Sequence, residues 1–368
     1  SLSSFFSGIL NSNNKFAAAA AAPIILNIIL ILSLIISYKL NLNFVNQLSY
    51  GVTLAGVLQL VFLFFVTLKF YKPTLTLRLK VNNKVKKFFK KLLPSIFSSG
   101  ITQINILIGT IIASYEAGAV SYLYYADRIY QINLAIAGIA VGTVSLPALS
   151  KAFKNRNIKK LSNIQSKSFE LSLLLSIPAS LGLILASEEI VNSLFGYGSF
   201  SEKDVKLTAD ALKYFGYGVP AFALVKILSN FFFARDNTKT PLYISIFMVI
   251  INISISVSLF ASYGFIIIPI ATSISTWTGV LIYIYLLNEK NSLLLNKKLI
   301  PNFIKILAST IIMSIIMVLL INNYESYLNY SYKFKAIYLL SIVGFVGIVY
   351  LLSCYLFGIL KLKNYKTN

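Results

Sequence analysis

The apolar residues of this chain are gathered into long blocks that short polar stretches separate. A helix of about 20 apolar residues crosses the roughly 30 Å of hydrocarbon in a bilayer, and the blocks reach that length. Hydrophobic residues make up 57% of the 368 residues and charged residues only 12%, and a soluble fold of this size has too little interior to bury so much apolar surface. The strand alternation of a membrane barrel does not occur. The blocks therefore predict an all-α, polytopic membrane protein.

The blocks predict about ten full transmembrane helices. They lie at 17–38, 48–70, 92–115, 119–149, 169–187, 207–234, 241–262, 264–288, 303–321 and 335–360. Residues 1–12 resemble the end of an earlier span, and Ser1 is not preceded by Met or a basic segment, so we expect N-terminal sequence to be missing. Glu188–Glu189 is predicted to be the polar end of the span 169–187.

Basic residues are concentrated in alternate connectors. Most of the 33 Lys and Arg residues lie at Lys15, Lys69–Lys91, Lys151–Lys167, Arg235–Lys239, Lys290–Lys305 and Lys361–Lys366. The remaining connectors carry only Lys39, Lys203, Lys206, Lys333 and Lys335 as basic residues, and they carry the acids Glu116, Glu188, Glu189, Glu202, Asp204 and Glu325. Because Lys and Arg concentrate in cytoplasmic loops, the basic connectors and the C-terminus are predicted to be cytoplasmic. The net charge of +22 then indicates topology and contact with anionic membrane lipids, with no nucleic acid as partner.

One connector is long enough to separate two lobes. Within residues 71–91, the sequence KVNNKVKKFFKK (80–91) is typical of a basic amphipathic helix on the cytoplasmic surface. The predicted divisions are a first lobe at 1–70, the linker at 71–91 and a second lobe at 92–289.

Few ionisable residues lie deep within a predicted span, where each costs a few kcal/mol and therefore marks a candidate functional site. Asp127 and Arg128 lie roughly 15 Å from the start of the span 119–149, at 1.5 Å of rise per residue. Residues on one side of this helix form a single polar stripe: Ser121, Tyr124, Arg128, Gln131, Ala135, Gly138 and Gly142. Arginine suits forked hydrogen bonds to phosphate, so the stripe indicates a cleft for an anion. A structural ion pair between helices is the alternative.

Other polar residues extend this candidate site. Lys226 lies within the span 207–234 with Asn230 one turn further, although a lysine there could also snorkel toward the cytoplasmic end. Gln103 and Asn105 could add hydrogen bonds in the same cavity or act as packing contacts between helices. Gating or structural positions are predicted at Pro147, Pro220, Arg235, Asp236 and Pro241.

The sequence argues against an enzyme. There is no histidine, the single cysteine is Cys354 in an apolar stretch, and the acids are scattered. No metal site, disulfide or catalytic group is therefore predicted. Nucleotide-binding glycine motifs are also missing, so no cofactor is expected and the energy must come from elsewhere.

Several stretches resemble one family. GAVSYLYYADRIYQINLAIAGIAVGTVSLPALSKAF (118–153) closely resembles the signature stretch of the MurJ/MviN flippases. LNSNNKFAAAAAAPIILN (10–27), GVLQL (56–60), LFGYGSFSEKD (194–204) and FFFARDNTKTPL (231–242) are similar to the same family in the same order. The resemblance covers nearly the whole chain.

The resemblance implies a fourteen-helix transporter of the multidrug/oligosaccharidyl-lipid/polysaccharide exporter superfamily, with two six-helix lobes and a C-terminal helix pair. On that map the chain begins within the fourth helix, and residues 300–361 form the pair that holds a lipid tail. Arg128 matches the family's cavity arginine and Asp127 its neighbouring acid. Gln131 stands where many members have a glutamate. The spans that hold sodium in some members lack interior acids here, so membrane potential is the expected drive.

The leading hypothesis is a lipid II flippase of the bacterial cytoplasmic (inner) membrane that works by alternating access. Its substrate is undecaprenyl pyrophosphate carrying the cell-wall disaccharide-pentapeptide, and cell-wall synthesis proteins are further expected partners. One alternative is an exporter of another polyprenyl-linked glycan or of a drug; acids, rather than Arg128 and Lys226, would be expected in the cavity of a cation exporter. The other alternative is a non-transporting scaffold for cell-wall enzymes.

Overall fold

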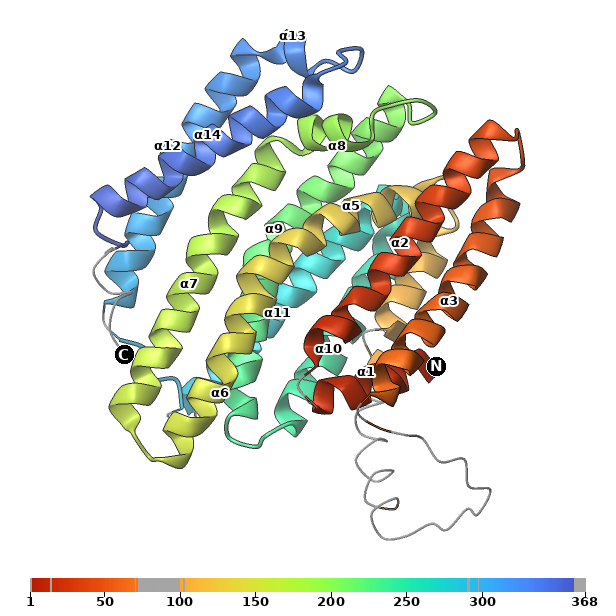
Figure 1. The fold of residues 1–368 in the computed structure, drawn as a ribbon. Coiled ribbons are helices and arrows are strands. Elements are labelled where there is room, and N and C mark those ends of the chain that lie inside the picture. The colour runs from red at the N-terminus through yellow and green to blue at the C-terminus, as the bar shows by residue number, and fades with distance from the viewer. Residues whose placement is uncertain are drawn as a thin grey trace. The chain divides into compact units, whose positions relative to one another are not determined.

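A computed structural model of the chain describes residues 2–13, 15–69, 71, 86, 100–101, 103–289, 292–296 and 298–360. Helices and their connections make up this described part, in which no strand occurs (Figure 1). The chain divides into two compact units, Ser1–Phe88 and Phe89–Asn368, and each is described by itself. The predicted linker at 71–91 lies outside the described residues apart from Tyr71 and Lys86, so the predicted division into lobes stays a prediction.

Eight segments of the described chain are long and apolar enough to cross a membrane. They are Ala17–Lys39, Phe44–Leu68, Ala119–Lys154, Ile158–Leu185, Glu202–Phe233, Lys239–Glu289, Leu299–Asn323 and Lys335–Leu356. The segment Lys239–Glu289 holds two helices, α10 (Lys239–Tyr263) and α11 (Ile267–Glu289), which a 3₁₀ turn at Gly264–Ile266 joins. The described part of the predicted span 92–115 contains the apolar helix Gln103–Ala113. The prediction of a polytopic helical membrane protein is confirmed.

The first unit is built on a hairpin of two long helices. Its helices are α1 (Leu2–Ser12), α2 (Phe16–Lys39) and α3 (Phe44–Leu68). The Asn43 side chain accepts hydrogen bonds from the amides of Val45 and Asn46 and so begins α3. A Cβ on Gly51 would collide with the Ser33 Oγ, so the glycine lets α2 and α3 approach closely.

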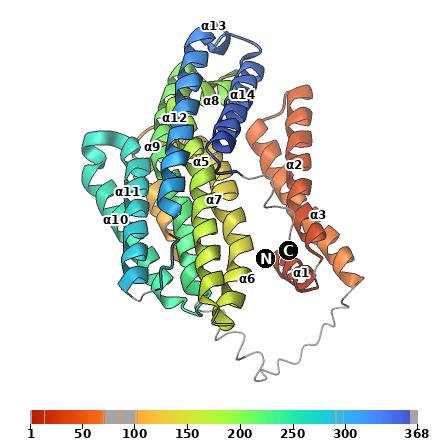
Figure 2. The same ribbon diagram turned by 90° about the vertical axis from the view of Figure 1, so that its left-hand side faces the viewer.

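The second unit is arranged around α9 (Glu202–Phe233). Its other helices are α5 (Ala119–Leu134), the π-helix η1 (Ala135–Ala140), α6 (Val141–Lys154), α7 (Ile158–Leu185), α8 (Ser187–Phe195), α10, α11, α12 (Leu299–Asn323), α13 (Glu325–Leu328) and α14 (Lys335–Leu356). Helix α9 contacts α5, α6, α7, α8 and α11, whereas α12 packs on α7 and α10 packs on α11 (Figures 1 and 2). Most of α9 is therefore buried.

Outer helices of this unit turn large apolar side chains away from the protein. On α10, Tyr243, Phe247, Ile250 and Val257 are exposed. Water would make such a surface unfavourable, whereas the hydrocarbon of a bilayer accepts it. This pattern agrees with a membrane location.

Helix ends differ from the predicted span ends because hydropathy does not detect polar turns. Helix α7 begins at Ile158, where the Asn157 side chain accepts from the amide of Lys160, and α9 begins at Glu202 with a capping box between Ser201 and Asp204. The prediction that Glu188–Glu189 ends a span is wrong. Helix α7 ends at Leu185, and both glutamates lie in the first turn of α8, where the helix dipole favours negative charge.

Candidate functional site

The predicted polar stripe is exposed along α5. Ser121, Tyr124, Arg128 and Gln131 all have exposed side chains on this helix. The Arg128 guanidinium carbon lies 4.5 Å from the centre of the Tyr124 ring, one helical turn away. Such cation–π contact stabilises the arginine by about 0.5–1 kcal/mol at an exposed position. The ring therefore holds the guanidinium in a defined direction along the helix surface.

Asp127 is engaged by Gln131 on the same helix. The Gln131 Nε2 donates a hydrogen bond to Asp127 Oδ2, and the aspartate is half-buried. The two residues are four apart and so are neighbours on the helix surface. The amide donor stabilises the carboxylate, and Arg128, the next residue of the helix, points about 100° away from it.

The stripe does not continue past Ala135, so the prediction of a single polar stripe is wrong at its C-terminal end. Residues 135–140 form a π-helix, in which a turn holds more residues than in an α-helix. The faces of the residues that follow are rotated as a result. Gly138 and Gly142 are buried, and they pack against α9 instead of lining an open surface.

Lys226 lies beside this glycine contact. A Cβ on Gly138 would lie 3.2 Å from Ala223 Cα and 3.5 Å from Lys226 Cγ. The alkyl part of the Lys226 side chain thus packs against η1 at Gly138. The Lys226 side chain as a whole is exposed. The structure therefore joins Lys226 to the helix that carries Arg128.

Asn230 holds α9 to the start of α6. Its side chain is buried, and Nδ2 donates to the carbonyl oxygen of Gly142 at 2.8 Å. This hydrogen bond gives Asn230 a structural role, because it joins α9 to α6. A contact between Asn230 and a ligand stays a prediction.

Replacement of Asn230 by leucine is expected to lower the free energy of unfolding by about 0.5–1.5 kcal/mol, because the hydrogen bond that joins α9 to the Gly142 carbonyl is lost. Denaturant unfolding of the purified protein in detergent measures the loss. Asn133→Leu is the matched control, since Asn133 donates only within its own helix, at 3.5 Å from the Ile129 carbonyl oxygen. Equal stability of the two variants would contradict the structural role of Asn230.

The other predicted polar positions are distributed over several elements. Gln103 is exposed and Asn105 is half-buried on the helix Gln103–Ala113. Pro147 is exposed within α6, and Pro241 is buried in the first turn of α10. Asp236 is exposed with a left-handed φ of 56° in the turn after α9. Any role of these residues in binding or gating stays a prediction.

Pro220 interrupts the hydrogen bonding of α9. A proline has no amide hydrogen, so the carbonyl of Gly216 four residues earlier is left without its helical donor. The Ser180 hydroxyl of α7 donates to this carbonyl at 2.7 Å. Trp277 Nε1 of α11 donates to the neighbouring Tyr217 carbonyl at 3.0 Å. Two neighbouring helices thus support the interrupted turn.

Arg235 connects three parts of the second unit. Its guanidinium donates to the carbonyls of Phe231 at the end of α9 and of Ser292 in the connection to α12. It also lies 5.5 Å from the centre of the Phe153 ring on α6. Burial lowers the pKa of the guanidinium, which stays charged. Arg235 was predicted to be a gating or structural position, and these contacts favour a structural role.

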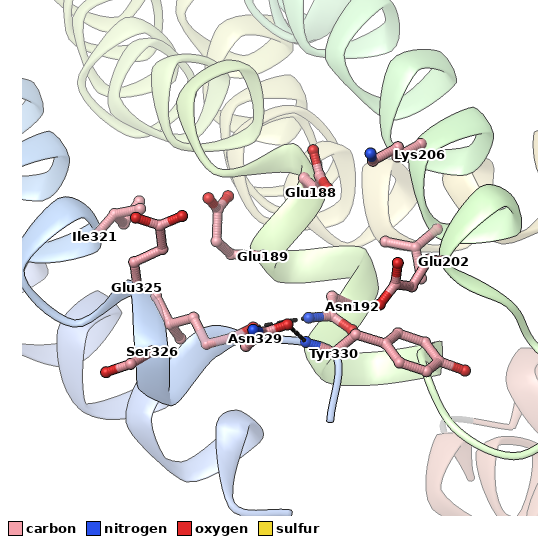
Figure 3. A pocket seen from close by; sticks show the side chains of 12 residues that line it. Glu188, Glu189, Asn192, Glu202, Lys206, Ile321, Glu325, Ser326, Asn329 and Tyr330 are labelled. Carbon is pink, nitrogen blue, oxygen red and sulfur yellow. Dashed lines mark hydrogen bonds between the residues drawn. The ribbon is translucent and has the colours of Figure 1, made fainter. Parts of the chain in front are cut away.

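An acidic pocket that the sequence did not predict lies at the α8–α13 end of the second unit. Its volume is about 520 Å³, and its lining residues come from α8, α9, α12, α13 and the residues that follow α13. The residues of the stripe on α5 do not line this pocket. Figure 3 shows the carboxylates of Glu188, Glu189, Glu202 and Glu325 around this pocket, with Lys206 at one side. Burial raises the pKa of Glu189, and the charges of Glu188 and Glu325 raise it further, while a hydrogen bond from its own backbone lowers it.

The raised pKa of Glu189 predicts a pH-dependent loss of stability. The folded protein holds a proton that the unfolded chain has released, so stability falls as the pH rises from the ordinary glutamate value of about 4.3 through the raised value. Glu189→Gln removes this loss, and its melting temperature at neutral pH is expected to exceed that of the parent by a few degrees. The gain should vanish in acid. Glu202→Gln, at the same pocket, is the control in detergent melts across this pH range, and a pH-independent gain at Glu189 would contradict the prediction.

Comparison with known proteins decides the family. A family model described as lipid II flippase MurJ matches residues 1–340. The chain belongs to this family. A MurJ of Rickettsia prowazekii (strain Madrid E), named a probable lipid II flippase, is 36% identical over all of this chain and 72% of its own length. One of Rhizobium meliloti (strain 1021), with the same name, is 39% identical over 77% of this chain and 53% of its own length.

Solved structures agree with the family. A lipid II flippase MurJ in an inward closed conformation is 25% identical, covers 97% of this chain and 70% of its own, and has a TM-score of 0.78. An inward-facing MATE transporter of the MOP superfamily, 17% identical with a TM-score of 0.65, covers 78% of this chain and 67% of its own and shows a related fold. As a MurJ family member with several apolar spans, the chain is a multi-pass protein of the bacterial inner membrane.

Proposed function

We propose that this chain translocates lipid II across the bacterial inner membrane by alternating access. The observation that carries the proposal is Arg128, whose exposed guanidinium lies over the Tyr124 ring within an apolar membrane segment. Membership of the MurJ family supports lipid II as the substrate.

A pyrophosphate group cannot enter hydrocarbon without large loss of solvation, so a carrier has to provide compensating charge. A guanidinium is always charged, and its planar fork matches two phosphate oxygens. Because Tyr124 covers one face of Arg128, the N–H groups at the edge of the guanidinium are left to bind the head group. Arg128 is therefore the proposed anchor.

Lys226 is the proposed second cation. It packs beside Gly138, ten residues after Arg128, which corresponds to roughly 15 Å along a helix. Two cations at different depths allow the head group to pass from one to the other. Asp127, held by Gln131, is the proposed orienting or gating acid. Ser121, Gln103 and Asn105 would add neutral hydrogen bonds.

The undecaprenyl tail need not leave the hydrocarbon while the head group crosses. The proposed groove for this tail lies along the C-terminal helix pair, α12 and α14, which pack on each other and expose apolar side chains such as Ile315 and Leu352. Movement is proposed at the helix interruption of Pro220, with Pro147 and Pro241 as further bends, and Arg235 and Asp236 next to the end of α9.

The C-terminus is proposed to be cytoplasmic, which places α8 and α13 on the outer side. No catalytic step belongs to this mechanism, and the membrane potential is the proposed drive. Cell-wall synthesis proteins are proposed as further partners.

Complementation of a flippase-depleted bacterium tests the proposal. Expression of the gene that encodes this chain is expected to restore lipid II at the outer leaflet, measured by its accessibility to an external lipid II-modifying enzyme. Restored growth without exposed lipid II would favour a scaffold for cell-wall enzymes. Export of a different polyprenyl-linked glycan, with lipid II kept inside, would favour the sister exporter.

A further inference from the structure

Lys335, the first residue of α14, has a completely buried side chain, with 0% of its surface exposed. Its ammonium donates to Asn192 Oδ1 at 2.9 Å, to the Gly196 carbonyl at 2.6 Å and to the Tyr330 carbonyl at 2.8 Å. A lysine ammonium has three hydrogens to donate. All three are therefore used within the protein.

Two aromatic rings complete the surroundings of this ammonium. Nζ lies 4.2 Å from the centre of the Tyr197 ring and 4.7 Å from that of Tyr330. A desolvated cation on an aromatic face gains about 2 kcal/mol or more. These groups are neutral, so the cost of burying the charge is offset by close coordination and not by an ion pair.

The same contacts join two connections that are far apart in the sequence. Asn192 is in α8 and Gly196 follows it, whereas Tyr330 lies between α13 and α14. Asn192 Nδ2 also donates to the Leu328 carbonyl at 2.8 Å, and the Tyr330 hydroxyl donates to the Phe200 carbonyl at 2.6 Å. We name this set of contacts the Lys335 clasp; its members are Asn192, Gly196, Tyr197, Phe200, Leu328, Tyr330 and Lys335.

The C-terminal helix pair, α12 and α14, is also attached to α7, at positions away from Lys335. The Tyr350 hydroxyl of α14 donates to the Leu174 carbonyl at 2.7 Å, and Asn302 Nδ2 of α12 donates to Glu170 Oε1 at 3.0 Å. The Lys335 clasp adds the attachment to α8, at the end where α13 lies (Figure 1). Helix α8 in turn leads directly from α7 to α9.

We propose that Lys335 is a positioning residue for transport: it fixes the α8–α13 end of the helix pair so that α12 and α14 move together with α7, α8 and α9. This role rests on the proposed function, because it keeps the proposed tail groove aligned with the lobe that carries Arg128 and Lys226. The opening of the clasp is measurable whether or not the substrate is lipid II.

A buried cysteine reports on the clasp. Cys354 is buried and is replaced by alanine as background, and Leu328, only 4% exposed, is changed to cysteine. In purified protein in nanodiscs, Lys335→Met is expected to raise the rate of maleimide labelling at position 328 at least about tenfold. Without the hydrogen bonds of Lys335, the structure around this cysteine opens more often and exposes its thiol to the reagent. Lys333→Met is the matched control, since it removes the same charge from the exposed surface of the same connection. Equal labelling of the two variants would overturn the clasp.

A covalent link tests positioning against a merely structural role. Asn192→Cys with Lys335→Cys, in the Cys354→Ala background, is expected to reduce flipping several-fold at equal protein level. A short bifunctional methanethiosulfonate reagent should restore flipping, and dithiothreitol should remove the restoration. Failure of the cross-linked protein to recover would overturn the positioning role. If Arg128→Ala flips normally while labelling and cross-linking behave as expected, the proposed head-group site fails and the clasp stands.

Discussion

Arg128→Ala is expected to lower the rate of lipid II flipping by about 100-fold, since losing the charged partner of a phosphate costs about 1.5–3 kcal/mol for each hydrogen bond. Arg128 is exposed on α5 and contacts the Tyr124 ring, so its removal leaves no buried cavity. The protein should therefore insert and fold normally. The measurement is the initial rate of head-group appearance at the outer leaflet, normalised to the amount of folded protein.

Two further variants separate charge from shape. Arg128→Lys keeps the positive charge but loses the planar fork, so an intermediate loss of about tenfold is expected if bidentate phosphate binding matters. Lys159→Ala removes an exposed cation from the first turn of α7 and should leave the rate within about twofold, as most exposed substitutions do. Flipping by Arg128→Ala at the parental rate would exclude Arg128 as the anchor.

The membrane helices were predictable because the length and apolarity of a span are set by the bilayer and can be read residue by residue. Their polar ends were not, since α7 and α9 begin at caps supplied by Asn157 and Ser201, outside the apolar blocks. Helix α8 was missed for the same reason. A helix of nine residues is too short to span a membrane, so hydropathy gives it no signal of its own.

The candidate site was predictable where it is local to one helix. The exposed positions of Ser121, Tyr124, Arg128 and Gln131 follow from the period of 3.6 residues. The bond between Gln131 and Asp127 was also readable, because residues four apart are neighbours on a helix. Simple periodicity failed at the π-helix, since one extra residue in a turn rotates everything that follows.

Contacts between distant segments could not be read from the pattern. Asn230 bonds to Gly142 across 88 residues, and Lys335 bonds to Asn192 across 143. In the sequence, Lys335 is an ordinary lysine at the start of a span, where it would be expected to reach into water. Only the arrangement of α8 and α13 surrounds it with acceptors.

Gly138→Leu is expected to have the second large effect, because η1, which continues α5, meets α9 at this glycine. A Cβ here would lie 3.2 Å from Ala223 Cα, a backbone atom that cannot move without shifting α9. Overpacking of this kind costs about 1–3 kcal/mol, and the larger leucine is expected at the upper end. Gly138→Ala should cost less. Thermal unfolding in detergent measures both.

The change at Gly138 also tests whether Arg128 and Lys226 work as one site. The glycine lies between the helices that carry these two cations, so forcing the helices apart should lower flipping by about tenfold even in the fraction that stays folded. Gly56→Leu on α3 is the control, since Gly56 is exposed, a Cβ there meets nothing within 4 Å and a better helix former replaces glycine. If Gly138→Leu is less stable but its folded fraction flips at the rate of the control, the two cations act independently, and the transfer of the head group between them is excluded.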